Sequence, residues 1–332
     1  MRRREFIASL MFAATMARAQ AQQTGKVYRI AFAHPTVPVS DQNQGSKGAF
    51  VISAIFEELI RLGYVEGRNL LIERYSGEGR AAHYPDLARQ IVGQNPDLII
   101  TTYRFVLDFK AATSTIPIVA VFADPIQLGI VPSLARPGGN ITGVTVDVGV
   151  DQWFKRIQLL KEAVPQISRL GFLHAGYLRE RLGARMHEIE LKNSVSIVGP
   201  PLERPTDEQE YHRVFSALTQ EGADGLVVSD EAENVTYRRL IVELAEKGRL
   251  PTIYPFRQFV EAGGLMSYGI DLSDVGHRVA DIVDKILKGA KPGEIPIFQP
   301  TQLELSINLK AAKTLGIELP PLLVARADNV IE

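Results

Sequence analysis

Residues 28–35, YRIAFAHP, and residues 168–176, SRLGFLHAG, share one design and open the two halves of a 332-residue chain. In each stretch a short apolar run ends in a histidine, and turn-forming or small residues follow. A run of this kind predicts a buried strand that ends in a loop. A second pair lies further along, NPDLIITT at residues 95–102 and GADGLVVSD at residues 222–230. The repetition predicts two halves in which similar elements follow in the same order.

Apolar, β-branched runs alternate with longer segments of helical period in both halves. The runs predicted as strands are 27–33, 70–75, 97–101, 116–122 and 141–145 in the first half, and 170–174, 195–198, 225–229 and 251–254 in the second. Val51, Ile55, Leu59 and Leu62 recur at helical spacing and predict a helix with one apolar face that ends near Gly63. Such alternation is typical of parallel sheets covered by helices. We therefore expect an α/β fold of two doubly wound parallel-sheet lobes.

The order of elements also predicts where a ligand binds. In open parallel sheets ligands lie beyond the carboxyl ends of the strands, so two sheets that face each other define a shared cleft. Gly, Asp and Pro residues near 145–150, 268–271 and 295–300 mark three segments where we expect the chain to cross between lobes. This division assigns 26–145 with 270–296 to lobe 1, and 146–269 with 297–332 to lobe 2. Bending of such a three-segment hinge would close the cleft on a solute.

The composition excludes several classes of function. The formal net charge is only −1, which gives no electrostatic argument for a nucleic-acid partner. The chain has no cysteine, which excludes disulfides and thiolate chemistry, and its six histidines lack metal-site spacing, so we expect no metal. P-loop, G-x-S-x-G and H-E-x-x-H motifs are absent, and the G-x-G-x-x-A pattern at residues 77–82 follows the second strand rather than the first. We expect no cofactor and no enzyme activity.

Residues 1–21 have the layout of a secretory signal peptide. Three arginines at residues 2–4 precede an apolar run at residues 6–17, and A-x-A patterns end at Ala19 and Ala21. We expect cleavage near one of these alanines and a mature protein in the periplasm. The stretch RREFI at residues 3–7 also fits the twin-arginine pattern, so general secretion and twin-arginine export both stay open.

Seven stretches in the same chain carry a family resemblance. They are RRREFIASL (2–10), LGYVEGRNLLIE (62–73), AATSTIPIV (111–119), SLARPGGNITG (133–143), FVEAGGLMSYG (259–269), VDKILKGAKPGEIPIFQPT (283–301) and NLKAAKTLGIELPPLLVARADNVIE (308–332). In order and spacing they resemble the ABC transporter substrate-binding family whose best-known members take up tryptophan and related amino acids. The resemblance spans essentially the whole chain.

The resemblance implies a type I periplasmic-binding fold without chemistry of its own. It implies capture of a small organic solute, amino-acid-like or an aromatic or branched carboxylate, with an ABC permease and ATPase in the inner membrane as partners. We expect a monomer. Two alternatives stay open, because the same clamshell can signal to a membrane receptor kinase, and an exported α/β enzyme could use a carboxylate pair. The loops at 34–36, 101–104 and 173–176 depart from the family pattern where specificity would be set.

The ends of the predicted strands supply the candidate ligand-binding residues. Asp124 and Asp230 follow strands in the two halves and could bind a ligand amine, or could simply start a turn and cap a helix. Thr101, Thr102 and Tyr103 precede a helix and could bind a carboxylate, with helix capping as the alternative.

The remaining candidates come from the first-strand loops and from the hinge. His34 and Thr36, with His174 and Tyr177 in the matching loop, could form hydrogen bonds in the cleft. Tyr254 and Tyr268 could hold an apolar ligand body between aromatic faces, with packing at the hinge as the alternative.

Overall fold

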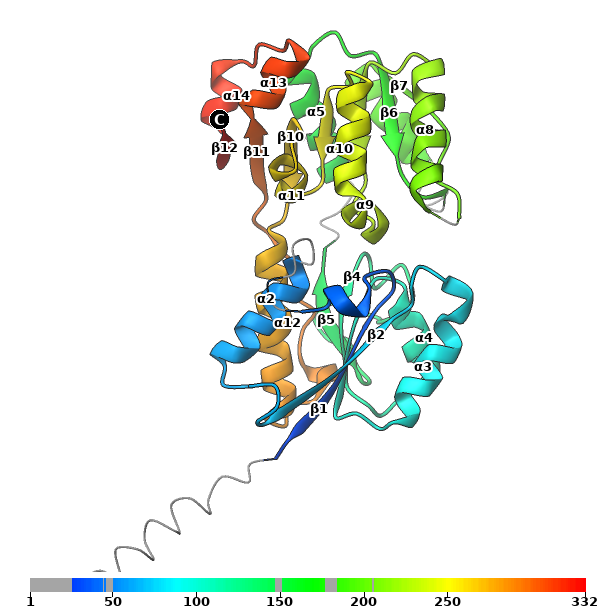
Figure 1. Ribbon diagram of the computed structural model, residues 1–332, viewed down its shortest axis with the longest axis vertical. Coiled ribbons are helices and arrows are strands. Elements are labelled where there is room, and N and C mark those ends of the chain that lie inside the picture. The colour runs from blue at the N-terminus through cyan, green and yellow to red at the C-terminus, as the bar shows by residue number, and fades with distance from the viewer. Residues whose placement is uncertain (1–25, 44, 46–49, 147–150, 177–183, 205) are drawn as a thin grey trace, which may run out of the picture.

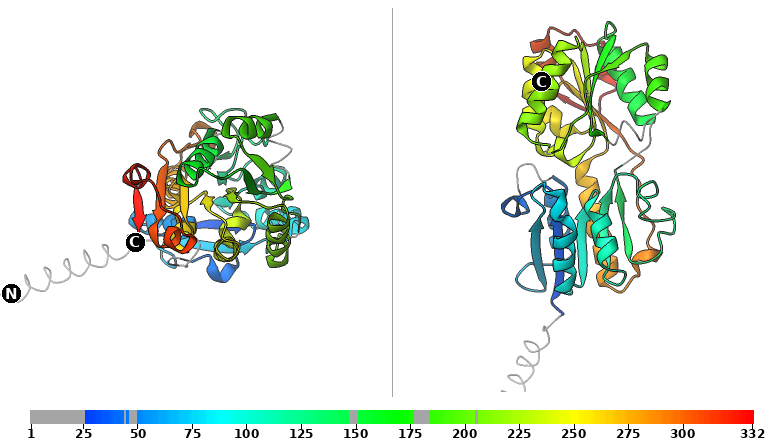
Figure 2. Two further views of the ribbon diagram at one scale, coloured as in Figure 1. Left: turned by 90° about the horizontal axis from the view of Figure 1, so that it is seen from above. Right: turned by 90° about the vertical axis from the view of Figure 1, so that its right-hand side faces the viewer.

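Two α/β lobes lie end to end along the long axis of the molecule (Figures 1 and 2). The computed structural model describes residues 26–43, 45, 50–146, 151–176, 184–204 and 206–332. The predicted signal peptide lies outside these residues. Within the described ranges, none of the helices combines the length and apolar character that crossing a bilayer requires.

Lobe 1 is built on a five-stranded parallel sheet with the strand order β2-β1-β3-β4-β5. Its strands are β1 (Tyr28–His34), β2 (Leu70–Ser76), β3 (Leu98–Thr102), β4 (Ile118–Phe122) and β5 (Ile141–Thr145). Its helices are α2 (Phe50–Arg61), α3 (Tyr84–Gly93), α4 (Phe105–Ala112) and α12 (Leu272–Leu287), with short 3-10 helices η1 (Val39–Asp41), η2 (Ala81–His83) and η3 (Pro292–Glu294).

Alternation along β1 explains why helices cover both faces of this sheet. Ile30 and Phe32 pack into one apolar cluster with residues of α2 and α12, whereas Ala31 and Ala33 pack into another with residues of α3 and α4. Gly276 allows α2 and α12 to approach closely, because a Cβ atom there would lie 2.5 Å from the Cβ of Ala54. The strands of lobe 1 are therefore held on both sides, and their carboxyl ends form a fixed edge.

Lobe 2 is built on a seven-stranded sheet with the strand order β12-β11-β10-β9-β8-β6-β7. Its strands are β6 (Arg169–Leu173), β7 (Ser196–Val198), β8 (Gly225–Val228), β9 (Thr252–Tyr254), β10 (Met266–Gly269), β11 (Glu304–Asn308) and β12 (Asn329–Ile331). Its helices are α5 (Asp151–Ala163), α7 (Ala184–Asn193), α8 (Glu208–Gln220), α9 (Ala232–Thr236), α10 (Arg238–Lys247), α11 (Arg257–Glu261), α13 (Leu309–Leu315) and α14 (Pro321–Ala325).

The two sheets repeat the same spatial order of strands. In lobe 2, β7-β6-β8-β9-β10 matches β2-β1-β3-β4-β5 of lobe 1, so the predicted internal repetition and the α/β two-lobe class are confirmed. Lobe 2 then adds β11, which runs antiparallel to β10, and β12, which is parallel to β11. The sequence patterns do not predict β10, β11 or β12. Length does not explain the omission, because the three-residue strands β7 and β9 are predicted, whereas the missed β11 has five residues.

Two of the predicted crossings between the lobes lie among the described residues. The chain passes from lobe 2 to lobe 1 between β10 and α12, where the sequence predicts a crossing at residues 268–271, and it returns between η3 and β11. The third predicted crossing, near residues 145–150, consists largely of residues 147–150, which lie outside the described residues.

Two short segments belong to lobe 1 although the predicted boundaries place them in lobe 2. The N–H of Phe298 donates to the carbonyl oxygen of Gly143 at 2.9 Å, so Phe298 pairs with β5, and the N–H of Ile297 donates to the carbonyl oxygen of Leu134 at 2.8 Å. The N–H of Val146 donates to the carbonyl oxygen of Phe122 at 2.8 Å. Backbone pairing with β4 and β5 therefore extends lobe 1 to Val146 and moves the return crossing beyond Phe298.

Candidate functional site

A cavity of about 610 Å³ lies between the lobes, at the carboxyl ends of strands from both sheets. Lobe 1 contributes residues that follow β1, β3 and β4, and lobe 2 contributes residues that follow β6, β7 and β8. The two sheets thus present their strand ends to one shared cavity, as their predicted order requires. Its volume lies in the range of pockets that bind small organic molecules.

Tyr103 belongs to the lobe 1 wall of this cavity. It directly follows β3 and has a φ of 53°, in the left-handed region that residues other than glycine rarely adopt. Its N–H donates to the carbonyl oxygen of Val121 at 2.7 Å, which holds the backbone in this conformation. Strained residues of this kind cluster at ligand sites. The phenol lines the large cavity and also a second, smaller one of about 60 Å³.

Thr101 and Thr102 are buried at the end of β3. Neither hydroxyl has a hydrogen-bond partner among the described residues, and Thr102 lines the smaller cavity. Arg104, rather than a threonine, stands at the N-cap of α4, and its side chain makes no capping bond. Helix capping therefore does not account for the two threonines. Arg104 itself lines the large cavity beside Tyr84 and Phe105.

His34 is buried at the end of β1 in its neutral form. Its Nδ1 accepts hydrogen bonds from the N–H groups of Thr36 at 3.2 Å and Val37 at 2.9 Å, so the ring proton must lie on Nε2. Burial lowers the pKa of His34 to about 3. The ring lines the smaller cavity beside Thr102. Thr36 contacts the opposite lobe, where its Oγ1 lies 3.5 Å from Oγ1 of Thr236.

Asp124 adopts the turn role that the sequence analysis gave as its alternative. Its Oδ1 accepts from the N–H groups of Ile126 at 3.0 Å and Gln127 at 2.9 Å. The neighbouring Ala123 lines the cavity. The structure therefore places this carboxylate in a local turn beside the cleft.

Glu231, which the sequence analysis does not single out, is the buried carboxyl of the lobe 2 wall. Its Oε1 accepts from the N–H of Ala175 at 3.2 Å, and its Oε2 accepts from Nδ2 of Asn234 at 3.3 Å. Asn234 is fixed in turn, because its Oδ1 accepts from the hydroxyl of the buried Tyr211 at 2.9 Å. Glu231 thus connects the loop after β6 to the start of α9 and also lines the cavity.

Burial and neighbouring charge perturb the ionisation of this wall. Burial, with the negative charge of Asp230 beside it, raises the pKa of Glu231 to about 8. Burial also raises the pKa of Tyr103, and the charges of Asp230, Glu233 and Glu231 add to this effect. The negative charges of the loop after β8 in lobe 2 therefore act across the cleft on Tyr103 of lobe 1.

The sequence signal for Glu231 is present but easily passed over. Residues 229–234, SDEAEN, follow β8 just as residues 101–104, TTYR, end and follow β3. Attention to the first polar residue of each loop selects Asp230. The turn into α9 instead buries the next residue, Glu231, and leaves Asp230 half-buried. The depth of a side chain in such a turn depends on the backbone path, which the pattern does not contain.

His174 and Tyr177 have different outcomes. His174 is buried at the end of β6, its Nδ1 lies 2.8 Å from the carbonyl oxygen of Ala175, and its ring packs against Phe172 at 4.5 Å between centroids. Ala175 and Gly176 line the cavity in its place. Tyr177 lies outside the described residues.

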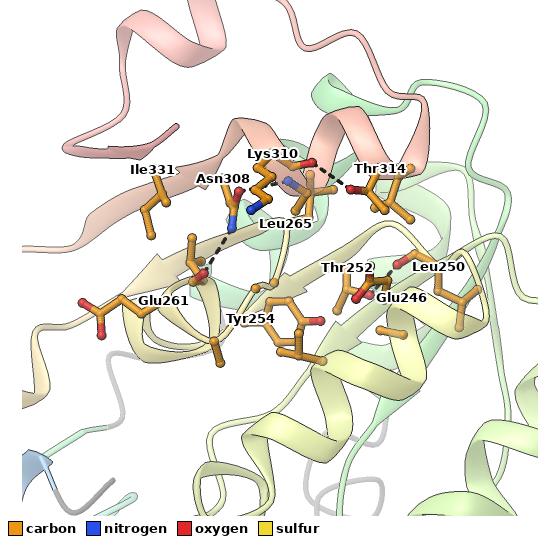
Figure 3. Close-up of a pocket in the computed structure, with 18 residues that line it drawn as sticks. Glu246, Leu250, Thr252, Tyr254, Glu261, Leu265, Asn308, Lys310, Thr314 and Ile331 are labelled. Atoms are coloured by element: carbon orange, nitrogen blue, oxygen red, sulfur yellow. Dashed lines mark hydrogen bonds between the residues drawn. The ribbon is translucent and has the colours of Figure 1, made fainter. Parts of the chain in front are cut away.

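Tyr254 lies in a different cavity, which Figure 3 shows. This cavity of about 350 Å³ is lined by residues of lobe 2 alone, among them Lys310 of α13 and Glu246 of α10. The ring of Tyr254 stacks on Phe259 with centroids 5.0 Å apart. β9 has only three residues, and its last side chain faces α10 and α11 rather than the opposite lobe. The structure therefore does not bring Tyr254 to the cleft.

Tyr268 belongs to the hinge. Its carbonyl oxygen accepts from Nε of the buried Arg156 at 2.7 Å. Tyr268 also lines a hollow of about 970 Å³, together with residues of the two segments that cross between the lobes. The next residue, Gly269, lies against the backbone, because a Cβ atom there would be 1.9 Å from the carbonyl oxygen of Pro255. Tyr268 thus takes the hinge-packing role that the sequence analysis left open.

The cavity walls differ in chemical character. Lobe 1 contributes the aromatic rings of Tyr84, Tyr103 and Phe105, together with Arg104. Lobe 2 contributes the carboxyl groups of Glu203, Glu231 and Glu233, together with Arg204. Within the described residues, no group of three or more metal-ligating side chains is placed to hold a metal ion. An apolar body with charged ends fits this arrangement.

Comparisons with known proteins agree with this geometry. Residues 47–331 match the model of a family described as ABC transporter substrate binding protein. A tyrosine-binding protein of Clostridioides difficile is 25% identical over 261 residues, which cover 77% of this chain and 73% of that protein. The crystal structure of a conserved domain protein from Vibrio cholerae has a TM-score of 0.80 at 25% identity, covering 92% of this chain and 100% of the other. That of an ABC domain from Streptococcus pneumoniae in complex with L-tryptophan has a TM-score of 0.78 at 22% identity, covering 92% and 99%.

Proposed function

Since the chain belongs to the ABC transporter substrate-binding protein family and has the type I periplasmic-binding fold, we propose that it is the periplasmic solute-binding component of an ABC importer. In this proposal the protein captures a small organic solute in the inter-lobe cleft by hinge closure and delivers it to a permease and ATPase in the inner membrane. It acts as a monomer and transforms nothing.

The cavity between the lobes carries the proposal. Its walls come from strand-end loops of both sheets, so a solute held there contacts both lobes at once. A ligand that contacts both lobes binds the closed arrangement better than an open one and therefore shifts the population toward closure. Separation of the lobes about the segments at residues 269–272 and 299–303 would divide the site into two halves.

The lining supports an amino acid or a related aromatic carboxylate as the solute class. Tyr84 and Tyr103 offer aromatic surface to an apolar body, with the buried Phe105 packed behind Tyr84, and carboxyl groups and Arg104 are available for charged ends. The relatives named for tyrosine and for L-tryptophan point in the same direction.

A thermal-shift screen of the mature protein tests this proposal. The panel contains the twenty L-amino acids, indole-3-propionate, 3-(4-hydroxyphenyl)propionate and a set of sugars, and calorimetry follows each hit. We expect an aromatic or branched amino acid to raise the melting temperature, since a ligand at 100 times its Kd stabilises the folded state by about 2.7 kcal/mol.

Variants and scattering place the site. Tyr103→Ala should sharply reduce the shift at the same ligand concentration, whereas Lys310→Ala, in the other cavity, should leave it unchanged. Small-angle scattering should show a smaller radius of gyration with the ligand. A shift with sugars alone contradicts the solute class, and a shift that survives Tyr103→Ala but not Lys310→Ala places the site elsewhere.

A further inference from the structure

Glu231 has an environment that is unusual for a carboxyl group in a binding cleft. Only 8% of its surface is exposed, and that part lines the cavity between the lobes. Its two protein donors, the N–H of Ala175 and Nδ2 of Asn234, are neutral and lie at 3.2 and 3.3 Å. Among the described residues, no salt bridge pairs it with a cation.

The other titratable and charged groups around Glu231 come from every adjoining element. Asp230 and Glu233 flank it on the same turn, and Tyr211 approaches from α8. His174 comes just before Ala175, the hydrogen-bond partner of Glu231 in the loop after β6. Glu203 and Arg204 line the cavity from the loop after β7, and Tyr103 and Arg104 line it from lobe 1. The nearest charges that act on Glu231 are negative. A buried carboxyl in such surroundings favours its neutral form, and its pKa is accordingly raised to about 8.

We propose that Glu231 is the specificity-determining group of the cleft: it receives the positively charged amine of the solute, and its own proton leaves for the solvent as the solute binds. This inference rests on the proposed function and extends it by naming the group that selects a cationic solute. Before binding, the carboxyl carries a proton in the cavity wall. In the complex, carboxylate and ammonium face each other and the released proton balances the charge.

There is a physical reason for Glu231 to be protonated in the ligand-free protein. An ionised Glu231 beside Asp230 and Glu233 would bury uncompensated negative charge in the empty cleft. The neutral acid avoids this cost, and the arriving ammonium supplies the compensating charge. A solute of the same shape without the amine cannot supply it and leaves Glu231 protonated.

The proposal fixes the sign of the pH dependence of binding. When the pH is below the pKa that Glu231 has in the ligand-free protein, the carboxyl must lose its proton before it can pair with the ammonium group. The association constant for a cationic solute therefore rises with pH, by up to about tenfold per pH unit between pH 6 and 7. His34 does not contribute in this range, because its pKa lies at about 3.

Calorimetry in buffers of different ionisation enthalpy tests the proposal through proton release. The probes are L-tryptophan and L-tyrosine, the amines tryptamine and tyramine, and the des-amino acids indole-3-propionate and 3-(4-hydroxyphenyl)propionate. At pH 7, we expect wild-type protein to release close to one proton for each amine-bearing probe bound and none for a des-amino acid.

The variant Glu231→Gln keeps the shape and the acceptor for the N–H of Ala175 but cannot ionise. It should release no proton, bind amine-bearing probes with a flat profile between pH 6 and 7.5, and lose at least tenfold in affinity at pH 7.5. Glu246→Gln, the same change on the outer surface of α10 beside the other cavity, serves as the matched control and should behave like wild type. Unaltered proton release in Glu231→Gln overturns the proposal.

Two results separate this inference from the proposed function. Binding of des-amino acids alone, at this cleft, overturns the role of Glu231 while leaving a solute-binding protein. If none of the probes binds, NMR still tests whether Glu231 is protonated. The side-chain carboxyl ¹³C shift of Glu231 in the free protein, assigned by comparison with Glu231→Gln, is followed as a function of pH. A midpoint near pH 8 supports the stored proton, and one near 4.5 refutes it.

Discussion

His34 and Glu231 come from opposite lobes, His34 as the last residue of β1 and Glu231 in the turn after β8; His34 lines the smaller cavity and Glu231 the large one. Burial acts on both in the same way, by penalising the charged form. It lowers the pKa of His34 to about 3 and raises that of Glu231 to about 8. Both groups are therefore neutral near pH 6.5. They differ in the interaction that each can make with a ligand. His34 can only donate a hydrogen bond from Nε2–H, whereas Glu231 can lose its proton and form an ion pair with a cationic ligand.

The comparison teaches that a repeated topology does not repeat the chemistry of its loops. β3 and β8 occupy the same place in the strand order, yet Tyr103 follows one and Glu231 the other. The aromatic wall can hold an apolar body, and the acidic wall can distinguish solutes by charge. Replacements at four positions test this difference between the two walls.

Removal of the aromatic side chain of Tyr103 should have the largest effect on affinity. Tyr103→Gly and Tyr103→Ala should each weaken binding of the cognate amino acid by about 50-fold, since a lost aromatic contact is worth about 2–3 kcal/mol. Only glycine accepts a φ of 53° without cost, so Tyr103→Gly should be about 1 kcal/mol more stable than Tyr103→Ala. Calorimetry and chemical denaturation measure the two quantities. Equal stabilities would show that the backbone is not strained there.

Replacement of Glu231 should change how stability depends on pH on the alkaline side. The folded protein holds this proton up to about pH 8, whereas an ordinary glutamate loses it near 4.5, so the folded state binds more protons between these values. Stability therefore falls as pH rises, by about 2 kcal/mol between pH 6 and 8. Glu231→Gln should remove this decline, and Glu246→Gln should retain it. A parallel loss in wild type and Glu231→Gln contradicts the raised pKa.

Replacement of His34 should act on the acid side with the opposite sign. The unfolded chain takes up a proton near pH 6.5, whereas the folded protein resists protonation down to about pH 3. The contribution of His34 to the free energy of unfolding is therefore complete above pH 6.5 and decreases as the pH falls, by about 1 kcal/mol between pH 6.5 and 5.5. His34→Asn, whose Oδ1 can accept from Thr36 and Val37, should lack this loss. The exposed His187 offers a control, and His187→Gln should follow the wild-type curve.

The contact between Thr36 and Thr236 should have the smallest effect. At 3.5 Å and exposed, this hydroxyl pair contributes little beyond what water supplies. Thr36→Val should change solute affinity by less than about threefold and stability by less than about 0.5 kcal/mol. A larger loss of affinity would indicate that the pair helps to hold the lobes together around the solute.

Strands that lie within a continuous apolar, β-branched run could be predicted from the sequence, including the three-residue β7 and β9, whereas β10, β11 and β12 could not. Residues 141–145 form β5 as expected, and the helix predicted from Val51 to Leu62 is α2 (Phe50–Arg61). β10 and β12 depend on pairing with strands distant in sequence, which supply their hydrogen bonds. The same dependence explains the boundary at Phe298, which is set by its bonds to β5.

The candidate site shows a similar division. Tyr103 lines the cleft, and His34 and Thr102 line the smaller cavity beside it, because their strands end at the shared edge. Asp124 and Tyr254 follow strands as well, but a local turn holds the first and packing under α10 and α11 holds the second. The position of a residue at a strand end could be inferred from the sequence, whereas the direction of its side chain depends on neighbours from other elements.

The α/β class, the internal repetition and the family follow from the amino-acid sequence, because apolar periodicity and ordered motifs are properties of the linear chain. That Glu231 rather than Asp124 is the buried carboxyl of the cleft depends on the folded arrangement. Burial and pKa depend on groups brought together from β6, β8, α8 and the opposite lobe, and the distances between such groups exist only once the chain has folded.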